Sequence, residues 1–174
     1  TNIVINQGGA ANPYPSTITV ANAPTIIGSM RVTLYDLSVN IPETVAYLLV
    51  GPGGQQFILL AAAGGLDPSG PATINFIDTA GQVVPDSGPL TTGDFEPTSW
   101  GTVPTFPPPA PSGPYNFPGS TVGGSGTQTL GGNFNGTNAN GTWSLYVTDA
   151  GTLVTGGPIG NIAGGWGLEF SAST

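Results

Sequence analysis

The sequence has no cysteine, no histidine and no lysine, and its only basic residue is Arg31. Without cysteine or histidine the chain cannot form a disulfide, a Ser-His-Asp triad, a Cys-His dyad or the usual zinc and haem sites. The missing lysine also excludes Schiff-base chemistry, Lys-Asn isopeptide bonds and the lysine of a phosphate-binding loop. Nine carboxylates against one cation give a net charge of −8, so no basic patch is available to bind nucleic acid. We therefore expect a protein that is not an enzyme and does not bind nucleic acid.

Long apolar runs are absent as well. The longest, around Val45–Val50 and Phe57–Ala63, is interrupted by Gly-Pro-Gly-Gly and falls short of the ~20 residues of a membrane span. The chain begins at Thr1 with no visible signal peptide, which fits a mature secreted product as well as a trimmed chain. We expect no membrane span and an extracellular, secreted or cell-surface location.

The pattern that is present is typical of β-structure. Short β-branched and aromatic runs alternate with clusters of Gly, Pro, Asn and Asp, and no segment shows a helical period. This favours an all-β fold, an antiparallel β-sandwich or jelly roll, formed by one domain over residues 1–174. The expected strands are Asn2–Asn6, Ser16–Val20, Ile26–Tyr35, Val45–Val50, Gln56–Ala61, Ala72–Asp78, Thr127–Leu130, Thr142–Thr148 and Gly164–Ser171.

The segment 85–126 differs from the rest, because prolines recur along it with Trp100, Phe106, Tyr115 and Phe117 between them. Proline removes donors from a β-ladder, so we expect long extended loops that cover the sandwich and are pinned by the aromatic side chains. A solvated proline-rich ligand is the alternative, although it would leave the aromatic residues without a packing role.

Several motifs, in order along nearly the whole chain, resemble the P domain of subtilisin-like proprotein convertases in its bacterial, stand-alone form. The most specific are Tyr47–Gly54 (YLLVGPGG), Asn140–Trp143 (NGTW) followed by Asp149, and Gly164–Trp166 (GGW). Further matching segments are Pro13–Val20, Arg31–Leu37, Thr73–Asp78 and Pro85–Gly88. The resemblance implies a jelly-roll, galactose-binding-like sandwich without catalytic residues, which serves as an accessory or surface module.

The resemblance also implies calcium positions, and most of them are lost. Many members have an acidic stretch before the LLVGPGG strand, where this chain has Glu43-Thr44-Val45-Ala46. Asp78 is retained, and Asp67 and Asp36 are further candidates, since calcium needs clustered oxygen ligands. We expect no cofactor, with calcium at these three residues as the open alternative.

Two sequence features are candidates for glycans or sugar binding. Asn135-Gly136-Thr137 and Asn140-Gly141-Thr142 are N-glycosylation sequons, although Asn-Gly also forms tight turns. Serine and threonine number 34, so covalent glycans on a neutral, hydroxyl-rich surface are plausible partners. Trp100 is the candidate for stacking on a ligand, whereas Trp143 and Trp166 lie in strand motifs and are expected in the core.

The scarcity of charge points to assembly. Charged residues make up 6% of the chain, against about 25–35% of the surface of a typical soluble monomer. Such a surface is easy to desolvate between copies. Residues 1–11 comprise an expected strand, with Ile3, Val4 and Ile5, and a tether through Gly8-Gly9 that would allow the strand to add to a neighbour's sheet edge.

The leading hypothesis is a non-catalytic extracellular subunit that assembles with copies of itself into a filament or surface layer. One alternative is an accessory module that stabilises a secreted protease or surface protein. A second alternative is a carbohydrate-binding module, since β-sandwiches host sugar sites on many unrelated proteins.

Overall fold

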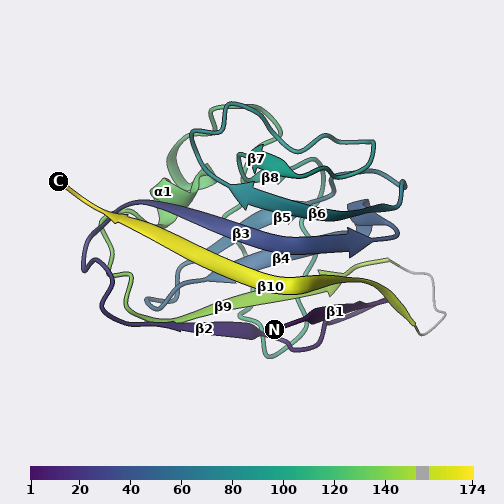
Figure 1. Cartoon of the computed structure of the whole chain (residues 1–174), viewed down its shortest axis with the longest axis horizontal. Helices are drawn as coiled ribbons and strands as arrows, with labels where there is room; N and C mark the ends of the chain where they lie inside the picture. The colour runs from purple at the N-terminus through teal and green to yellow at the C-terminus, as the bar shows by residue number, and fades with distance from the viewer. Residues whose placement is uncertain (152–156) are drawn as a thin grey trace.

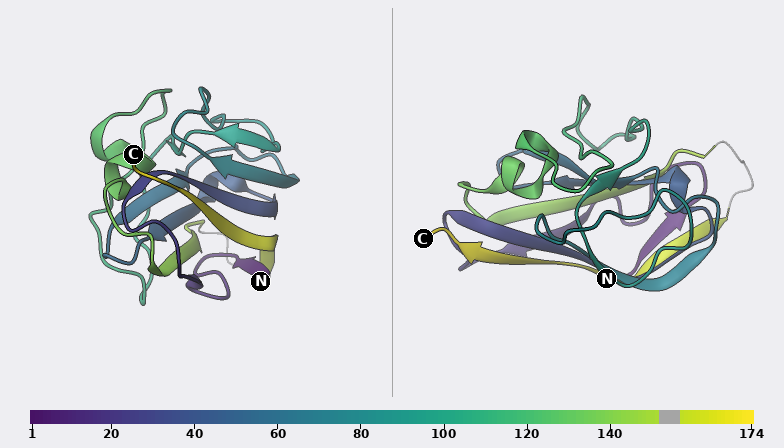
Figure 2. Two further views of the ribbon diagram at one scale, coloured as in Figure 1. Left: turned by 60° about the vertical axis from the view of Figure 1, so that its left-hand side comes forward. Right: turned by 90° about the horizontal axis from the view of Figure 1, so that it is seen from above.

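The computed structural model describes residues 1–151 and 157–174 as two β-sheets packed face to face (Figures 1 and 2). Sheet A has the strand order β1-β10-β3-β6-β7, and sheet B has the order β2-β9-β4-β5-β8. The strands are β1 (Ile3–Asn6), β2 (Ser16–Val20), β3 (Ile27–Val39), β4 (Val45–Val50), β5 (Gln56–Ala61), β6 (Ser69–Phe76), β7 (Gly93–Phe95), β8 (Thr98–Ser99), β9 (Gly141–Asp149) and β10 (Pro158–Ala172).

The expected all-β sandwich is confirmed in its general form, with one main hydrophobic core between the sheets. Alternate residues of the strands point into this core, as the period of two in a strand requires. Trp143 of β9 is fully buried at its centre, with its indole ring centroid 5.1 Å from that of Phe134. The Trp166 indole N–H donates to Ser16 Oγ at 3.0 Å, which links β10 in sheet A to β2 in sheet B. The prediction that Trp143 and Trp166 belong to the core is therefore confirmed.

The expectation of purely antiparallel sheets is wrong at two edges. β7 pairs parallel with β6 at the edge of sheet A, and β8 pairs parallel with β5 at the edge of sheet B. Both short strands belong to the proline-rich segment, which reaches the edges through long connections instead of hairpins. Parallel pairing requires a long connection, and this segment supplies it.

The predicted strand Thr127–Leu130 is also wrong, because this stretch forms two short helical turns. A 3-10 helix covers Gly126–Gln128, and α1 covers Leu130–Phe134. The Thr129 hydroxyl accepts the Gly132 N–H at the start of α1, as an N-cap residue does. The Asp78 carboxylate accepts the N–H groups of Leu130 and Gly131, so a residue distant in sequence completes the cap.

The outer face of sheet B is covered by the proline-rich segment, which forms a second, smaller core there. Phe106 is 3% exposed and packs with Leu48 and Ile58, which point outward from β4 and β5. Tyr14, Tyr115 and Tyr146 complete this cluster, in which the Tyr14 hydroxyl donates to Pro107 O at 2.7 Å. The prediction of loops packed on the sandwich is confirmed, with Phe106 and Tyr115 as the pinning aromatic residues, whereas Trp100 and Phe117 are 37% and 48% exposed. This packing explains why β4 and β5 are apolar on both faces.

The outer face of sheet A is open and polar. Thr33 Oγ1 donates to Asn75 Oδ1 at 2.6 Å, and Asn75 Nδ2 donates to Asp94 Oδ1 at 2.9 Å, across three neighbouring strands. Arg31 Nη1 lies 3.7 Å from Glu169 Oε2 on the adjacent strand, so the arginine is paired with a neighbouring carboxylate.

Candidate assembly site

The N-terminal strand β1 forms one edge of sheet A. It pairs antiparallel with the first part of β10, with Ile3 opposite Ile162 and Val4 opposite Asn161. Ile3 and Ile5 point into the main core and are fully buried, whereas Val4 points away from it and is half-buried. The three residues predicted for assembly therefore lie in the protein's own sandwich in this form.

The segment that follows β1 is bound to sheet B. The Asp149 carboxylate accepts the Gly8 N–H at 2.8 Å, and the Asp149 N–H donates to Gly9 O at 2.9 Å. The Ala11 N–H donates to Val147 O at 2.9 Å, so this segment runs beside β9. The tether is hydrogen-bonded in this form, and Asp149, which is 4% exposed, is its main anchor.

The glycines of the tether have space around them. A Cβ at Gly9 would meet nothing within 4 Å, and a Cβ at Gly8 would meet only Gly151 O at 3.7 Å. Gly8 also has a φ of +72°, a left-handed backbone that glycine adopts without strain. The two glycines therefore pack against little, and the segment is held mainly by its backbone hydrogen bonds and by the buried Ala11.

The second half of β10 lacks a partner on the β1 side. β1 pairs only with residues between Pro158 and Ile162, while β3 pairs along the other side of β10 as far as Ala172. Among the described residues no strand pairs with Trp166–Ala172 on the β1 side, and we call this stretch the open edge.

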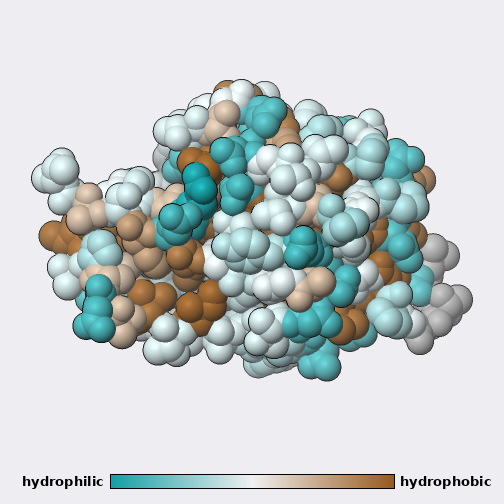
Figure 3. Space-filling model, in the orientation of Figure 1, coloured by the Kyte–Doolittle hydropathy of each residue, from teal (hydrophilic) through white to brown (hydrophobic). Residues whose placement is uncertain are grey.

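Apolar side chains are exposed beside the open edge. Leu168 and Phe170 on β10, and Ile18 and Val20 on β2, pack against the core but remain half-buried. Figure 3 shows apolar residues between the positions that β10 and β2 occupy in Figure 1. The only charged residue in the open edge is Glu169, which is paired with Arg31. The charged or proline residues that usually protect a sheet edge are therefore few here.

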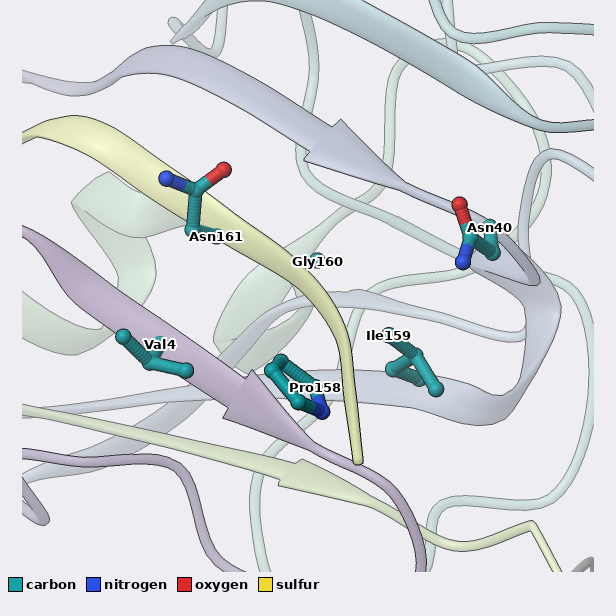
Figure 4. A pocket seen from close by; sticks show the side chains of 6 residues that line it. All are labelled: Val4, Asn40, Pro158, Ile159, Gly160 and Asn161. Atoms are coloured by element: carbon teal, nitrogen blue, oxygen red, sulfur yellow. The ribbon is translucent and has the colours of Figure 1, made fainter. Parts of the chain in front are cut away.

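A shallow depression of about 400 Å³ lies where β1 meets β10 (Figure 4). Its lining carries no ionisable side chain and comprises Val4, Asn40, Pro158, Ile159, Gly160 and Asn161. The surface that surrounds β1 is thus neutral, with apolar and amide groups side by side, and it can be desolvated without stripping water from a charge.

The three calcium candidates, Asp36, Asp67 and Asp78, lie in different structural settings. Asp78 caps the N-terminus of α1, as described above. Asp36 has a left-handed φ of 56°, and its backbone N–H donates to Thr73 Oγ1, whereas Asp67 is exposed in the loop before β6. Among the described residues no three acidic side chains form a group that could hold a metal ion. The calcium hypothesis therefore has no cluster to support it in this part of the chain.

The two candidate glycosylation sites lie in different environments. Asn135 is exposed, directly after α1, in a turn that the Thr137 N–H closes on Phe134 O. The Asn140 carboxamide is engaged by the backbone: its Oδ1 accepts the Ala23 N–H and its Nδ2 donates to Ala23 O, both at 2.9 Å. Asn140 therefore holds the chain between β2 and β3 in place.

Trp100 follows β8 and is 37% exposed. Its indole N–H donates to Val84 O at 2.7 Å, so the ring is anchored, and part of it faces solvent. A nearby pocket of about 380 Å³ is lined mainly by the proline-rich segment, including Val103, Tyr115 and Phe117, but Trp100 is not among its lining residues. The ring and the pocket are therefore separate features.

Comparison with known proteins adds no further identification: no family model, no curated protein and no solved structure matches the chain. Among the described residues no helix is long and apolar enough to cross a membrane.

Two features of this site were not recognised from the sequence. In the sequence Asp149 stands out only as part of a motif, and nothing links it to Gly8, which lies 141 positions away. The open edge arises because β10 has fifteen residues and β1 has four, and a difference in length between paired strands is visible only once the pairing is known.

Proposed function

We propose that this protein is a non-catalytic, extracellular structural subunit that assembles with copies of itself by exchanging β1. In the assembly, β1 of one copy occupies the place beside β10 of the next copy. Because this exchange is head to tail, repeating it produces a filament or layer instead of a closed dimer.

The observation that carries the proposal is the way in which β1 is held. Its core contribution consists of two fully buried isoleucines, Ile3 and Ile5. Its backbone pairs with one strand, β10, and on the other side Val4 exchanges two hydrogen bonds with Asn12. An identical strand from another copy makes the same contacts, so the exchange loses no burial and can gain a new interface. Strand addition of this kind combines main-chain hydrogen bonds with pockets for alternate side chains.

The surroundings of β1 fit such an interface. The depression beside it is neutral, and the open edge adds a row of unpaired backbone groups on the same strand. With only ten charged residues in 174, few ion pairs or hydration shells oppose close contact between copies.

The proposal also covers how the two sheets are connected and to which family the chain is related. A jelly-roll connection of the two sheets, and kinship with the P domain of proprotein convertases, are supported by the two packed β-sheets and by the LLVGPGG, NGTW and GGW motifs. The extracellular location is supported by the lack of cysteine, lysine and charge, which suits a durable material with few sites for trypsin or oxidants.

The proposal is tested by measuring particle size at neutral pH over a range of concentrations, with light scattering and electron microscopy. We expect polymers that lengthen with concentration. A particle of 17.3 kDa at every concentration would contradict self-assembly.

Two matched variants then test the role of β1. Ile5→Asp places a charge in the strand that is exchanged, and Ile18→Asp places the same charge in β2, the edge strand of sheet B that stays in place. We expect Ile5→Asp to abolish polymers, because the core position of Ile5 excludes a charge whichever copy supplies β1, and Ile18→Asp to retain them. Near-UV circular dichroism distinguishes release of β1, which keeps the signal of the buried Trp143, from loss of the whole fold. Polymers of Ile5→Asp as long as those of the unmodified chain would contradict exchange of β1.

A further inference from the structure

We infer that Asn135, and not Asn140, is a site of N-linked glycosylation. Both residues stand in Asn-Gly-Thr sequons five positions apart, so the sequence treats them alike. The structure distinguishes them by what the side-chain nitrogen does in each.

The Asn140 nitrogen has no hydrogen to give up. Its Nδ2 donates one hydrogen to Ala23 O and the other to Asn138 Oδ1, both at 2.9 Å. N-glycosylation replaces one of these hydrogens with the anomeric carbon of a sugar. The sugar would then stand where one of the two acceptor oxygens lies, and the connection between β2 and β3 would have to move.

The Asn135 side-chain nitrogen makes no hydrogen bonds of this kind among the described residues. Asn135 is exposed, and no hydrogen bond of its side chain is found among the described residues. Its backbone is held by the Asn135 N–H, which donates to Gly131 O at 3.0 Å, and by the following turn at Gly136, which has a φ of +81°. The Asn135 Nδ2 lies beside Gly131, where a Cβ would meet it at 2.7 Å. Attaching a sugar therefore requires the exposed carboxamide to turn away from Gly131, but it breaks no hydrogen bond among the described residues.

The transfer balances with a lipid-linked oligosaccharide as the co-reactant. A bond forms between Asn135 Nδ2 and the anomeric carbon of the sugar, and the bond from that carbon to the lipid pyrophosphate breaks. The lipid pyrophosphate leaves with the electron pair, and the amide loses one proton.

The position of Asn135 leaves β1 accessible. α1, which ends at Phe134 directly before Asn135, lies at the end of the sandwich near the C-terminus, whereas β1 lies toward the other end (Figure 1). A glycan at Asn135 would add hydration to a surface that is poor in charge without covering the strand proposed for exchange.

The test is expression of the full chain through the secretory pathway of a host that glycosylates such sequons, followed by intact-mass measurement before and after treatment with peptide N-glycosidase. We expect one glycan per chain. Asn135→Gln should remove it, and Thr142→Ala, which destroys the second sequon but keeps the Asn140 hydrogen bonds, should leave it unchanged.

A glycan that survives Asn135→Gln and is lost in Thr142→Ala would overturn the inference. An unmodified chain that carries no glycan, while a control glycoprotein from the same host is glycosylated, would overturn it as well. Neither result depends on particle size, so the outcome is separate from that of the assembly experiment.

Discussion

Residues 1–11 and residues 85–126 are both poor in charge and rich in turn residues, yet they are held in different ways. The N-terminal segment is held by the pairing of β1 with β10 and by two buried isoleucines. The proline-rich segment is held by aromatic side chains, notably Phe106 and Tyr115, whose rings meet edge to face at 5.3 Å over sheet B.

The difference shows which part of the molecule can be shared between copies. Pairing of one strand with one neighbour is reproduced by any identical strand. The proline-rich segment 85–126, which we call the cover, packs on sheet B through many side chains. Because this segment is joined to the sandwich at both ends, it cannot be exchanged between copies. We therefore place assembly at β1 and assign the proline-rich segment to stability.

The largest loss of unfolding free energy is expected for a substitution in the cover. Phe106→Ala removes the central ring of the second core, and truncating a buried phenylalanine costs about 3–5 kcal/mol of unfolding free energy. Urea unfolding measures this loss. The length distribution of polymers at low temperature should be unchanged, and a selective loss of polymers in a folded Phe106→Ala protein would remove the distinction between the two segments.

A smaller loss of unfolding free energy is expected for a substitution in β1. Ile5→Ala creates a cavity in the main core and costs about 2–5 kcal/mol, whether the strand comes from the same copy or from another. Ile18→Ala on β2, where the side chain is half-buried, should cost less. Unfolding followed by tryptophan fluorescence compares the two variants, and equal losses would contradict the full burial of Ile5.

A still smaller loss of unfolding free energy is expected at Asp149, which anchors the tether. Asp149→Asn keeps the shape of the side chain but leaves one acceptor oxygen for two N–H groups, those of Gly8 and Gly151. Loss of one hydrogen bond to a carboxylate costs about 1.5–3 kcal/mol. We expect faster amide exchange at Gly8 and faster formation of polymers, with Asp67→Asn, an exposed residue, as the control. Slower polymerisation of Asp149→Asn would contradict the role of Asp149 as an anchor of the unexchanged form.

The smallest effect on stability is expected from the ionisation of Tyr14, which lies at the margin of the cover. Burial raises the pKa of Tyr14 from 10.0 to about 12, with additional contributions from Tyr115 and Tyr146. Because the folded state favours the neutral phenol, this contribution to stability is complete below pH 10 and is lost as the pH rises through 12.

An absorbance titration of the tyrosinate band measures this ionisation. The step near pH 12 should be missing from Tyr14→Phe. Ionisation of Tyr14 near pH 10 would show that the cover does not enclose it.

Much of the sandwich was predictable from residue patterns. β2, β4 and β5 have the bounds that their β-branched and aromatic runs predicted. Pro15 marks the start of β2, and the turn Gly51–Gly54 separates β4 from β5. β7 and β8 were missed because strands of three and two residues are too short to show a period. The helical turn at Leu130–Phe134 was missed because five residues with two glycines show no helical period, and part of its cap comes from Asp78, far away in the sequence.

The candidate site was predictable only in part. The sequence predicted a strand over Asn2–Asn6, and the face of that strand that carries Ile3 and Ile5 is buried in the structure. The sequence does not reveal that Asp149 binds the tether or that β10 extends beyond β1, because both depend on which strands become neighbours. The sequons at Asn135 and Asn140 likewise differ only through contacts made in the folded chain.

The most direct test of β1 exchange is a disulfide between two introduced cysteines, Val4→Cys and Asn161→Cys, in a chain that has no other cysteine. These residues stand opposite each other in the β1–β10 pair. The matched control is Thr17→Cys with Ser144→Cys, opposite each other in the β2–β9 pair, which does not exchange. After oxidation of the assembled protein, non-reducing electrophoresis should show a ladder of covalent oligomers for the first pair and a single monomer band for the control. A monomer band for the first pair, from material that electron microscopy shows to be polymeric, would contradict exchange of β1.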